Sequence, residues 1–477
     1  MIMTFYFYDL ETTGFDSRYG RIMQFAGQRT DNKFEPLGEP LEALIKIGAE
    51  VLPSPEAVLV TGITPQKTLE EGFTEVQFLD KFVKSALESD TVIVGYNSVR
   101  FDDEFMRNLL YRNFYDSYEW QWRDGRNRWD LLDVGRMMRA LRPEGVNWPT
   151  DDKGNPTNRL GMLTKLNNIE HGGAHDALAD VRATIELAKL FRISQPKLFD
   201  YLLSMRTKKD VASLVDPDKP QPFVYSSGRY PAENSKTTVA YPITTHPHNS
   251  GAVLVYDLRF DPSGFADMSI EQMLDNLKTR VKDKGKDFVR LPIKQLALNK
   301  CPAVAPVGVL DEQSWKRINL NLKTVQKNLV LLKQHDIIAK KALEVWEEYS
   351  KSREIDEDVD GQLYAGFLND KDKLLLPKIR HKSADELADY HPNFIDERLS
   401  ELLLRYKARN YPSSLSDKEK DIWSEHVKTR LEKGAGLSPS LENYFQSIQK
   451  LSADNSDERS QFLLEELKLY GESLIES

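Results

Sequence analysis

The stretch Asp9-Leu10-Glu11 constrains this chain more than any other part of its sequence. It directly follows Thr4-Phe5-Tyr6-Phe7-Tyr8, an aromatic run that is typical of a buried strand. Because alternate side chains of a strand share one face, both carboxylates point the same way. Divalent cations such as Mg²⁺ and Mn²⁺ prefer carboxylate oxygens as ligands. An isolated Asp-x-Glu is more often a pair of solvated acids, so the interpretation depends on the rest of the chain.

Two later stretches place further acids at the starts of expected helices. Phe101-Asp102-Asp103 follows a short buried strand over 91–95 and opens a helix to about residue 111. Acids in a first helical turn also suit the helix dipole, which is the alternative reading of Asp102 or Asp103 taken alone. Ala174-His175-Asp176 precedes a long amphipathic helix that carries Asp180 about one turn inside.

The acids and the histidine recur at a strand end and at two helix starts, and we interpret them as one site. Strands alternating with helices predict an α/β layer with a mixed sheet, and sites in such sheets lie at the carboxyl ends of strands. The candidate site residues are Asp9, Glu11, Asp102 or Asp103, and Asp180, together with His175.

Length and charge suggest several domains with different tasks. The 477 residues exceed what one hydrophobic core usually supports. The net charge is −9, yet residues 195–342 hold 23 Lys and Arg against 15 Asp and Glu. This asymmetry favours an acidic centre beside a basic binding surface, with a chance distribution of solvated charges as the alternative. Short apolar runs, the absence of a basic leader and the single Cys301 predict a cytoplasmic protein without a membrane partner.

Residues 98–142 are rich in groups that bind single strands. They contain nine Arg, no Lys and nine aromatic residues. Arg supplies phosphate contacts and aromatic rings supply stacking platforms for bases. Trp120 and Trp122 stand in a polar loop, so we interpret both as strand contacts, whereas Phe101, Phe105 and Phe114 are expected in the core.

Periodicity divides the rest of the chain. Pro53, Pro55 and 61–65 are expected to form a loop. The expected strands are 21–30, 41–46, 223–225, 237–241, 252–257 and 296–298; the expected helices are 73–88, 130–141, 159–167, 384–390, 395–410, 417–432 and 460–475. Composition changes near residues 192 and 352 predict domains at 1–192, 196–350 and 352–477.

The order Asp9-x-Glu11, Phe101-Asp102, His175 and Asp180 resembles the DEDD superfamily of 3′→5′ exonucleases, in its His-containing branch. The other branch has a Tyr where this chain has Asp176. The whole chain is similar to the bacterial exonuclease I family. The similar segments are Gly95-Tyr96-Asn97-Ser98-Val99-Arg100-Phe101-Asp102-Asp103-Glu104, Arg128-Trp129-Asp130-Leu131-Leu132-Asp133, Leu141-Arg142-Pro143-Glu144-Gly145 and Leu363-Tyr364-Ala365-Gly366-Phe367.

The resemblance implies a fold and an activity. The expected fold is an RNase H-like α/β exonuclease domain with a mixed sheet, then an SH3-like β-rich basic domain and a C-terminal α-helical domain. The expected activity is processive 3′→5′ degradation of single-stranded DNA to 5′-mononucleotides, in DNA repair and recombination. Two Mg²⁺ ions, with Mn²⁺ able to substitute, would be held by the four acids, and His175 would accept a proton from water.

The resemblance also implies substrate and partner contacts. The family pattern places the ligand directly after Phe101, so Asp102 is favoured over Asp103. A partner would be the acidic C-terminal tail of single-stranded DNA-binding protein, near Tyr201 and Trp315-Lys316-Arg317, and the protein is expected to be a monomer. The candidate substrate-binding residues are Glu11, Arg107, Tyr118, Trp122, Arg128, Arg136, Arg142 and Arg159.

Two other functions remain open at this point. A 3′→5′ exoribonuclease would use the same five residues, because the 2′-hydroxyl is recognised by shape that the sequence does not show. A non-catalytic single-strand-binding protein on a nuclease fold would be indicated by loss of a ligand or of the histidine, and neither is lost.

Overall fold

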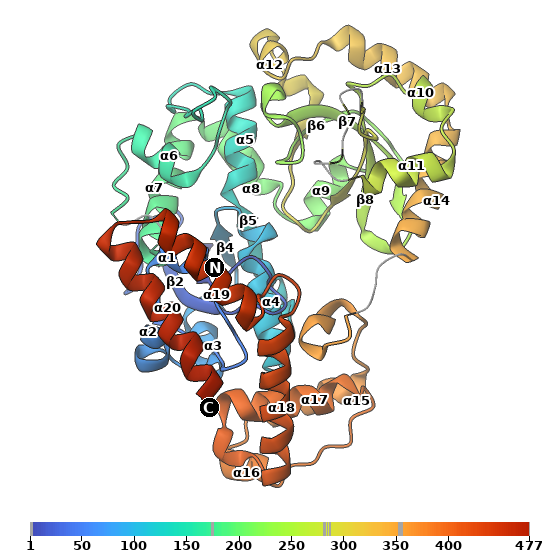
Figure 1. The fold of residues 1–477 in the computed structure, drawn as a ribbon. Helices are drawn as coiled ribbons and strands as arrows, with labels where there is room; N and C mark the ends of the chain where they lie inside the picture. Colours follow the sequence, from blue (N-terminus) through green and yellow to red (C-terminus); the bar gives the residue numbers. More distant parts are fainter. Residues whose placement is uncertain are drawn as a thin grey trace. The chain divides into compact units, whose positions relative to one another are not determined.

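The computed structural model describes residues 3–172, 176–279, 283, 285, 288–351 and 356–476 (Figure 1). The chain forms two compact units, each of which is assembled from separate segments. Unit 1 comprises Met1–Asn127, His171–Ile185 and Ile355–Ser477, and unit 2 comprises Arg128–Glu170 and Glu186–Glu354.

The first sheet is mixed and is built around β1 (Thr4–Thr12), which confirms the expected strand. β2 (Ile22–Thr30) pairs with it antiparallel and β4 (Thr91–Gly95) pairs with it parallel. β3 (Leu41–Leu44) extends the sheet beyond β2. The order is β3-β2-β1-β4-β5, and β5 (Asn127–Asp130) lies where the chain passes out of unit 1. β1 therefore occupies the middle of the sheet.

Helices of the N-terminal part of unit 1 cover this sheet with an aromatic core. Tyr6, Phe25, Phe78, Phe82 and Phe105 are buried together in it. The helices are α1 (Pro55–Thr61), α2 (Pro65–Glu71), α3 (Glu75–Ala86) and α4 (Asp102–Arg112).

The expectation of a loop holds for Pro53 and for residues 62–64, but it is wrong for Pro55, Thr61 and Pro65, which lie in α1 and α2. Each helix begins with a proline whose fixed φ suits the first helical position. The side chains of Ser54 and Thr64 cap the two helices by accepting from the amides of Ala57 and Lys67. These prolines start helices instead of interrupting them.

The C-terminal helices belong to the same unit as the first sheet. Met23 and Val58 share a buried cluster with Tyr444 and Leu467, and α20 lies along α1 and α2 (Figure 1). Helices α16, α17, α18 and α20 were expected, whereas α15 and α19 were not. Their bounds are α15 (Asp370–Arg380), α16 (Ala384–Ala388), α17 (Arg398–Asn410), α18 (Asp417–Lys433), α19 (Leu441–Asp454) and α20 (Glu458–Glu476).

Unit 2 contains an antiparallel five-stranded sheet of order β10-β6-β7-β8-β9. The four expected strands are present, and β10 is an additional edge strand. The strands are β6 (Phe223–Ser226), β7 (Thr237–His246), β8 (Asn249–Asp257), β9 (Ile293–Ala297) and β10 (Ala303–Pro306).

Helices also account for much of unit 2. α7 (Ala177–Ser194) starts in unit 1 and ends in unit 2. The others are α5 (Leu131–Leu141), α6 (Leu160–Leu166), α8 (Pro196–Ser204), α9 (Lys208–Leu214), α10 (Ser263–Ala266), α11 (Ile270–Lys278), α12 (Glu312–Arg317), α13 (Leu322–Gln334) and α14 (Ile337–Lys351).

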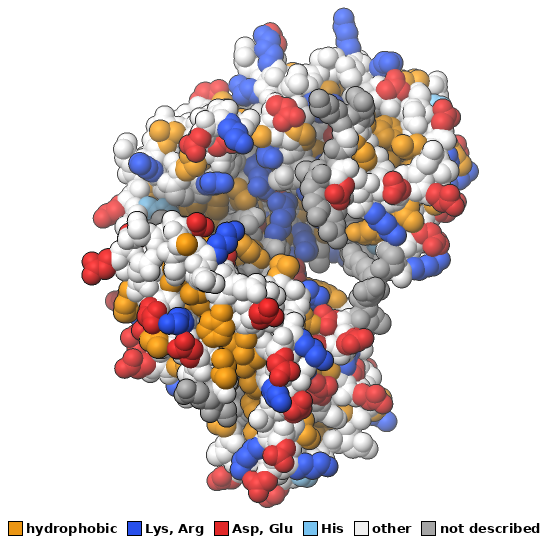
Figure 2. All heavy atoms as spheres, in the orientation of Figure 1, with side chains coloured by type: hydrophobic (Ala, Val, Ile, Leu, Met, Phe, Trp, Pro, Cys, Tyr) orange, Lys and Arg blue, Asp and Glu red, His pale blue; other side chains and the backbone are white. Residues whose placement is uncertain are grey.

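The surface shows charges of both signs, and Lys and Arg gather in one area of the face drawn in Figure 2. Within the described residues, no helix combines the length and the apolar composition that crossing a membrane would require.

Candidate active site

β1 presents Asp9 and Glu11 on one face of the first sheet. The residues are two positions apart, and they stand opposite Ala26 and Gln24 of β2 in the ladder. β2 pairs with the strand along both acids, and β4 pairs with residues 4–7, which precede them. The preceding aromatic residues are buried, which anchors the strand in the core. The backbone under the two acids is therefore rigid.

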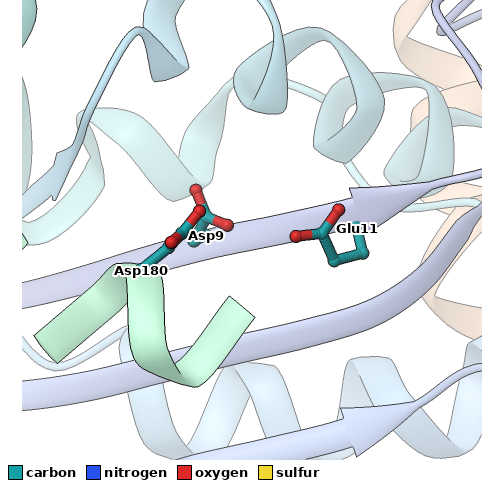
Figure 3. Close-up of side chains that lie close together, drawn as sticks. All are labelled: Asp9, Glu11 and Asp180. Carbon is teal, nitrogen blue, oxygen red and sulfur yellow. The ribbon is translucent and has the colours of Figure 1, made fainter. Parts of the chain in front are cut away.

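Asp180 reaches the same place from the first turn of α7. Carboxylate oxygens of Asp9, Glu11 and Asp180 all lie within 4.8 Å of one another. Figure 3 shows Asp9 and Glu11 along one strand, with Asp180 approaching from the end of the helix. Three carboxylates at this separation suit a hard divalent cation.

The neighbouring acids Asp102 and Asp103 differ in their surroundings. Both are buried in the first turn of α4. Asp103 accepts a hydrogen bond of 2.6 Å from the Tyr8 hydroxyl, so it ties α4 to β1. The charge of Asp102 acts on both Asp9 and Glu11. Electrostatic interaction therefore associates Asp102 with the acid cluster.

The cluster is electrostatically strained before any cation binds. Burial, followed by repulsion from Asp102, raises the pKa of Asp9 well above its usual range. Burial, followed by repulsion from Asp180 and Asp102, raises the pKa of Glu11 to about 8. A divalent cation would relieve this repulsion, because it favours the charged form of every carboxylate around it.

Gln24 connects the start of α7 to the sheet. Its Oε1 accepts from the Ala177 amide at 3.2 Å, and its Nε2 donates to Asp176 Oδ1 at 2.9 Å. Nε2 also donates to Glu42 Oε1 at 3.1 Å. Sequence reasoning missed Gln24, because a glutamine inside a strand matches no motif until the strand pairing is known.

Two histidines precede α7 in the chain. His175, the candidate base, lies outside the described residues. His171 is partly buried, and its Nε2 is in close contact with Asp180 Oδ1. Nothing in the sequence singles out His171 except its position nine residues before Asp180.

The residues of unit 1 that are candidates for contact with a nucleic-acid strand differ in burial. Arg107 is buried between Glu104, at 2.7 Å, and Gln121, at 2.8 Å, and its guanidinium lies over the Tyr118 ring. Trp122 is 61% exposed, as a base-stacking residue requires.

The interpretation of Trp120 as a strand contact is wrong, because this side chain is only 2% exposed. Its ring packs against Tyr8 and Phe82, and its Nε1 donates to the Ser117 carbonyl. Trp120 is a core residue on η2 (Glu119–Gln121), a short turn that turns one tryptophan inward and leaves the next exposed.

The residues of unit 2 that are candidates for contact with a nucleic-acid strand also differ in exposure. Arg128 is buried and donates to the Asn299 carbonyl at 2.6 Å. Arg136 pairs with Asp133, and Arg142 bonds the Val309 carbonyl at 2.9 Å. Arg159 is exposed at the start of α6.

Comparison with known proteins matches the chain along nearly its whole length. The family model "Exonuclease" matches residues 6–188, "Exonuclease I SH3-like domain" matches 206–348, and "Exonuclease I C-terminal domain" matches 357–474. Exodeoxyribonuclease I of Escherichia coli strain K12 is 38% identical over 474 residues, covering 99% of this chain and 98% of its own.

Solved structures agree with this similarity. An exonuclease I from Methylocaldum szegediense, described as moderately thermophilic, superposes with a TM-score of 0.93 at 40% identity over 99% of this chain and 100% of the other. The zinc-bound form of an E. coli exonuclease I complex with single-stranded DNA gives a TM-score of 0.93 at 37% identity, again over 99% and 100%.

Proposed function

Because the chain belongs to the exonuclease I family and is an exodeoxyribonuclease, we propose that it degrades single-stranded DNA from the 3′ end to 5′-mononucleotides. The chain has the exonuclease, SH3-like and C-terminal domains of that family. The observation that carries the proposal is the convergence of Asp9, Glu11 and Asp180 from two elements. The single-stranded DNA complex of the E. coli relative supports the choice of substrate.

The exonuclease fold implies dependence on divalent metal, and we propose two Mg²⁺ ions with Mn²⁺ as a substitute. The donor set fits such ions: it consists of buried carboxylates whose mutual repulsion a dication would offset. Asp9, Glu11, Asp102 and Asp180 would hold the ions. When bound, such ions polarise the scissile phosphate and make an attacking water more acidic.

The side chains then divide the remaining work. His175 would accept the proton of the attacking water, as a histidine with an ordinary pKa near 6.5 can do at neutral pH. Glu11 would also contact the 3′-terminal nucleotide, because it stands near the end of β1. Arg159 would hold the scissile or neighbouring phosphate through its charged fork.

Some side chains would contact the DNA strand directly, and others would hold those contacting groups in place. We assign stacking of bases to exposed Trp122, and phosphate contacts to Arg136 and Arg142. Arg107 and Arg128 are occupied by protein acceptors, so their contribution would be to hold Tyr118 and the neighbouring backbone in place.

A cluster of basic side chains in unit 2 supports a longer strand path. Desolvation and then the charge of Arg136 lower the pKa of Lys236. Desolvation, together with the charges of Arg229 and Arg290 and against the opposing charge of Asp257, lowers the pKa of Lys294 to about 8. Crowded cations favour an anionic partner, and DNA phosphates supply one. We call Arg136, Arg229, Lys236, Arg290 and Lys294 the basic cluster.

Several broader assignments belong to the same proposal. The acidic tail of single-stranded DNA-binding protein would dock near half-buried Tyr201 and the end of α12, where Lys316 is exposed. The protein would act as a cytoplasmic monomer in DNA repair and recombination. Domain boundaries at 1–192, 196–350 and 352–477 are supported by the ranges of the three family models.

The function is tested by comparing matched oligonucleotides. Full-length protein is incubated with single-stranded DNA, duplex DNA and RNA of one sequence, with Mg²⁺ or with chelator, and released mononucleotides are quantified. We expect Mg²⁺-dependent release from single-stranded DNA that far exceeds release from the other two. Comparable release from RNA would instead indicate an exoribonuclease, and binding without any release would indicate a non-catalytic single-strand-binding protein.

A further inference from the structure

We propose that Gln24 is a positioning residue of the metal centre: its side-chain amide fixes the start of α7, and with it Asp180, against β1. The inference rests on the proposed function, because it treats Asp9, Glu11 and Asp180 as the ligands of a cation. Gln24 itself contacts neither substrate nor metal in this account.

The side chain of Gln24 is placed for this task by the register of the sheet. Gln24 stands directly opposite Glu11 in the β1–β2 ladder and is buried. Its acceptor oxygen and one donor hydrogen both face α7, through Ala177 at 3.2 Å and Asp176 at 2.9 Å. The other donor hydrogen faces Glu42 of β3 at 3.1 Å. One amide therefore joins two strands to the first residues of a helix.

The turn that carries Asp180 is built on the residue that Gln24 holds. Asp176 Oδ2 accepts from the Ala179 amide at 3.2 Å, which pairs one of the amides that a helix start otherwise leaves without a partner. The Asp180 amide donates to the Asp176 carbonyl at 3.0 Å. A shift of Asp176 would therefore move Asp180 with it.

Electrostatic repulsion explains why such a connection is needed. Carboxylate oxygens of Asp9, Glu11 and Asp180 all lie within 4.8 Å of one another, so the start of α7 and the end of β1 repel each other when these groups are ionised. Before a cation binds, neutral hydrogen bonds have to oppose this repulsion. Gln24 supplies two such bonds without adding another charge to the cluster.

Gln28 provides a matched control in the same strand. It is also a buried glutamine of β2, four residues further on. Its Nε2 donates to the carbonyls of Arg29, Leu37 and Gly38, so it holds a surface turn and no acid of the cluster. Replacing Gln28 removes a comparable set of hydrogen bonds without touching α7.

The test measures Mn²⁺ binding to the full-length protein in the absence of DNA, by calorimetry, together with the thermal midpoint. The variants are Gln24→Met, which keeps the length of the side chain, and Gln24→Asn, which keeps an amide but is too short to reach α7. We expect both to weaken Mn²⁺ binding by roughly 10-fold or more, as loss of a group that orients ligands commonly does. Gln28→Met should bind Mn²⁺ within about twofold of wild type, even if its thermal midpoint falls as far as that of the Gln24 variants.

A reversed pair distinguishes positioning from general packing. The reversed pair, Gln24→Glu with Asp176→Asn, exchanges donor and acceptor between these two positions, and Glu42→Gln accompanies it because the new carboxylate cannot donate to Glu42. This combination should recover most of the lost Mn²⁺ affinity. Wild-type affinity in either Gln24 variant, or an equal loss in Gln28→Met, would overturn the role of Gln24 alone. Absence of Mn²⁺ binding in the wild-type protein would overturn the metal site of the proposed function and this inference with it. Where Gln24→Met does not fold, Gln24→Asn and the reversed pair decide the question.

Discussion

At the scale of single residues, the site depends on acids that the fold forces together. β1 fixes Asp9 and Glu11 on one face, and α4 and α7 add Asp102 and Asp180. Burial and repulsion raise the pKa values of Asp9 and Glu11, and a bound cation would offset this repulsion. Asp103 is equally buried but serves a different purpose, as the partner of Tyr8.

The first prediction separates the two adjacent aspartates. Asp102→Asn should reduce Mg²⁺-dependent cleavage by roughly 10²-fold or more, the size of effect that a group acting on charge at the reacting centre commonly has. Asp103→Asn should leave cleavage measurable and mainly lower the thermal midpoint, because it weakens the bond to Tyr8. Initial rates and melting curves of both variants check this. The reverse pattern would transfer the role of ligand to Asp103.

The second prediction concerns His175. As general base it should contribute roughly 10²–10⁴-fold to the rate. His175→Ala should therefore cleave slowly between about pH 6 and 9, a range chosen around the ordinary histidine pKa of ~6.5, while binding single-stranded DNA almost as tightly as wild type. Single-turnover rates and fluorescence anisotropy measure the two effects. Wild-type cleavage across that range would remove His175 from the mechanism.

The third prediction concerns the pH dependence of stability without metal. The pKa of Glu11 is raised from 4.5 to about 8 on folding, so between these values the folded state keeps a proton that the unfolded state has lost. Stability should fall as pH rises through this window, by at most about 1.4 kcal/mol per pH unit from this group. Added Mg²⁺ should oppose the fall. Thermal midpoints in chelator from pH 5 to 8 should decline less steeply in Glu11→Gln, and identical slopes would contradict the assignment.

At the scale of elements, local sequence patterns predicted most strands of the first sheet and most of the helices that cover it. Aromatic β1 and periodic α3 and α4 were expected near their observed positions, because their core faces are visible in the sequence. Prolines misled the interpretation of α1 and α2, where capping by Ser54 and Thr64 decided in favour of helices. Gln24 and Trp120 were missed or misassigned, because their roles depend on neighbours that are distant in the sequence.

The fourth prediction uses the contrast between two tryptophans of one loop. Trp120→Ala should destabilise the protein by about 3–5 kcal/mol, since it leaves a cavity in the core. Trp122→Ala should leave the thermal midpoint nearly unchanged and weaken single-stranded DNA binding by roughly 1–3 kcal/mol, the usual contribution of one stacked base. Denaturation curves and binding titrations on both variants measure this. Unchanged DNA affinity in Trp122→Ala would place the strand elsewhere.

At the scale of the whole molecule, the chain continues for nearly three hundred residues after Asp180, the last acid of the site. The C-terminal helices share a buried cluster with Met23 and Val58 in unit 1. Asp360, fully buried, pairs with Arg21 at 3.6 Å and with Arg409 at 2.5 Å. Truncation after Phe191 would expose these surfaces, so the purpose of the later domains is better tested by substitutions in the intact chain. In unit 2, the basic cluster would add phosphate contacts further along the strand.

The fifth prediction concerns processivity. An enzyme that holds one DNA strand at several places raises the effective concentration of each new 3′ end, so it cuts repeatedly before releasing the strand. The variants are Arg229→Ala with Lys236→Ala in the basic cluster. Their matched control is Lys327→Ala with Lys340→Ala, which removes two exposed lysines of α13 and α14. Cleavage of short oligonucleotides should remain close to wild type in both, because neither pair belongs to the acid cluster.

The measurement that tests the account most directly is the product-length distribution from a long 5′-labelled single-stranded DNA, with Mg²⁺ and an excess of unlabelled trap. Wild type and the Lys327 and Lys340 control should convert each bound strand to very short products and leave the remaining strands at full length. The Arg229 and Lys236 variant should give a ladder of intermediates. A ladder from the wild-type protein, or no shortening from the 3′ end in Mg²⁺, would contradict the proposal of a processive, single-strand-specific 3′→5′ exonuclease.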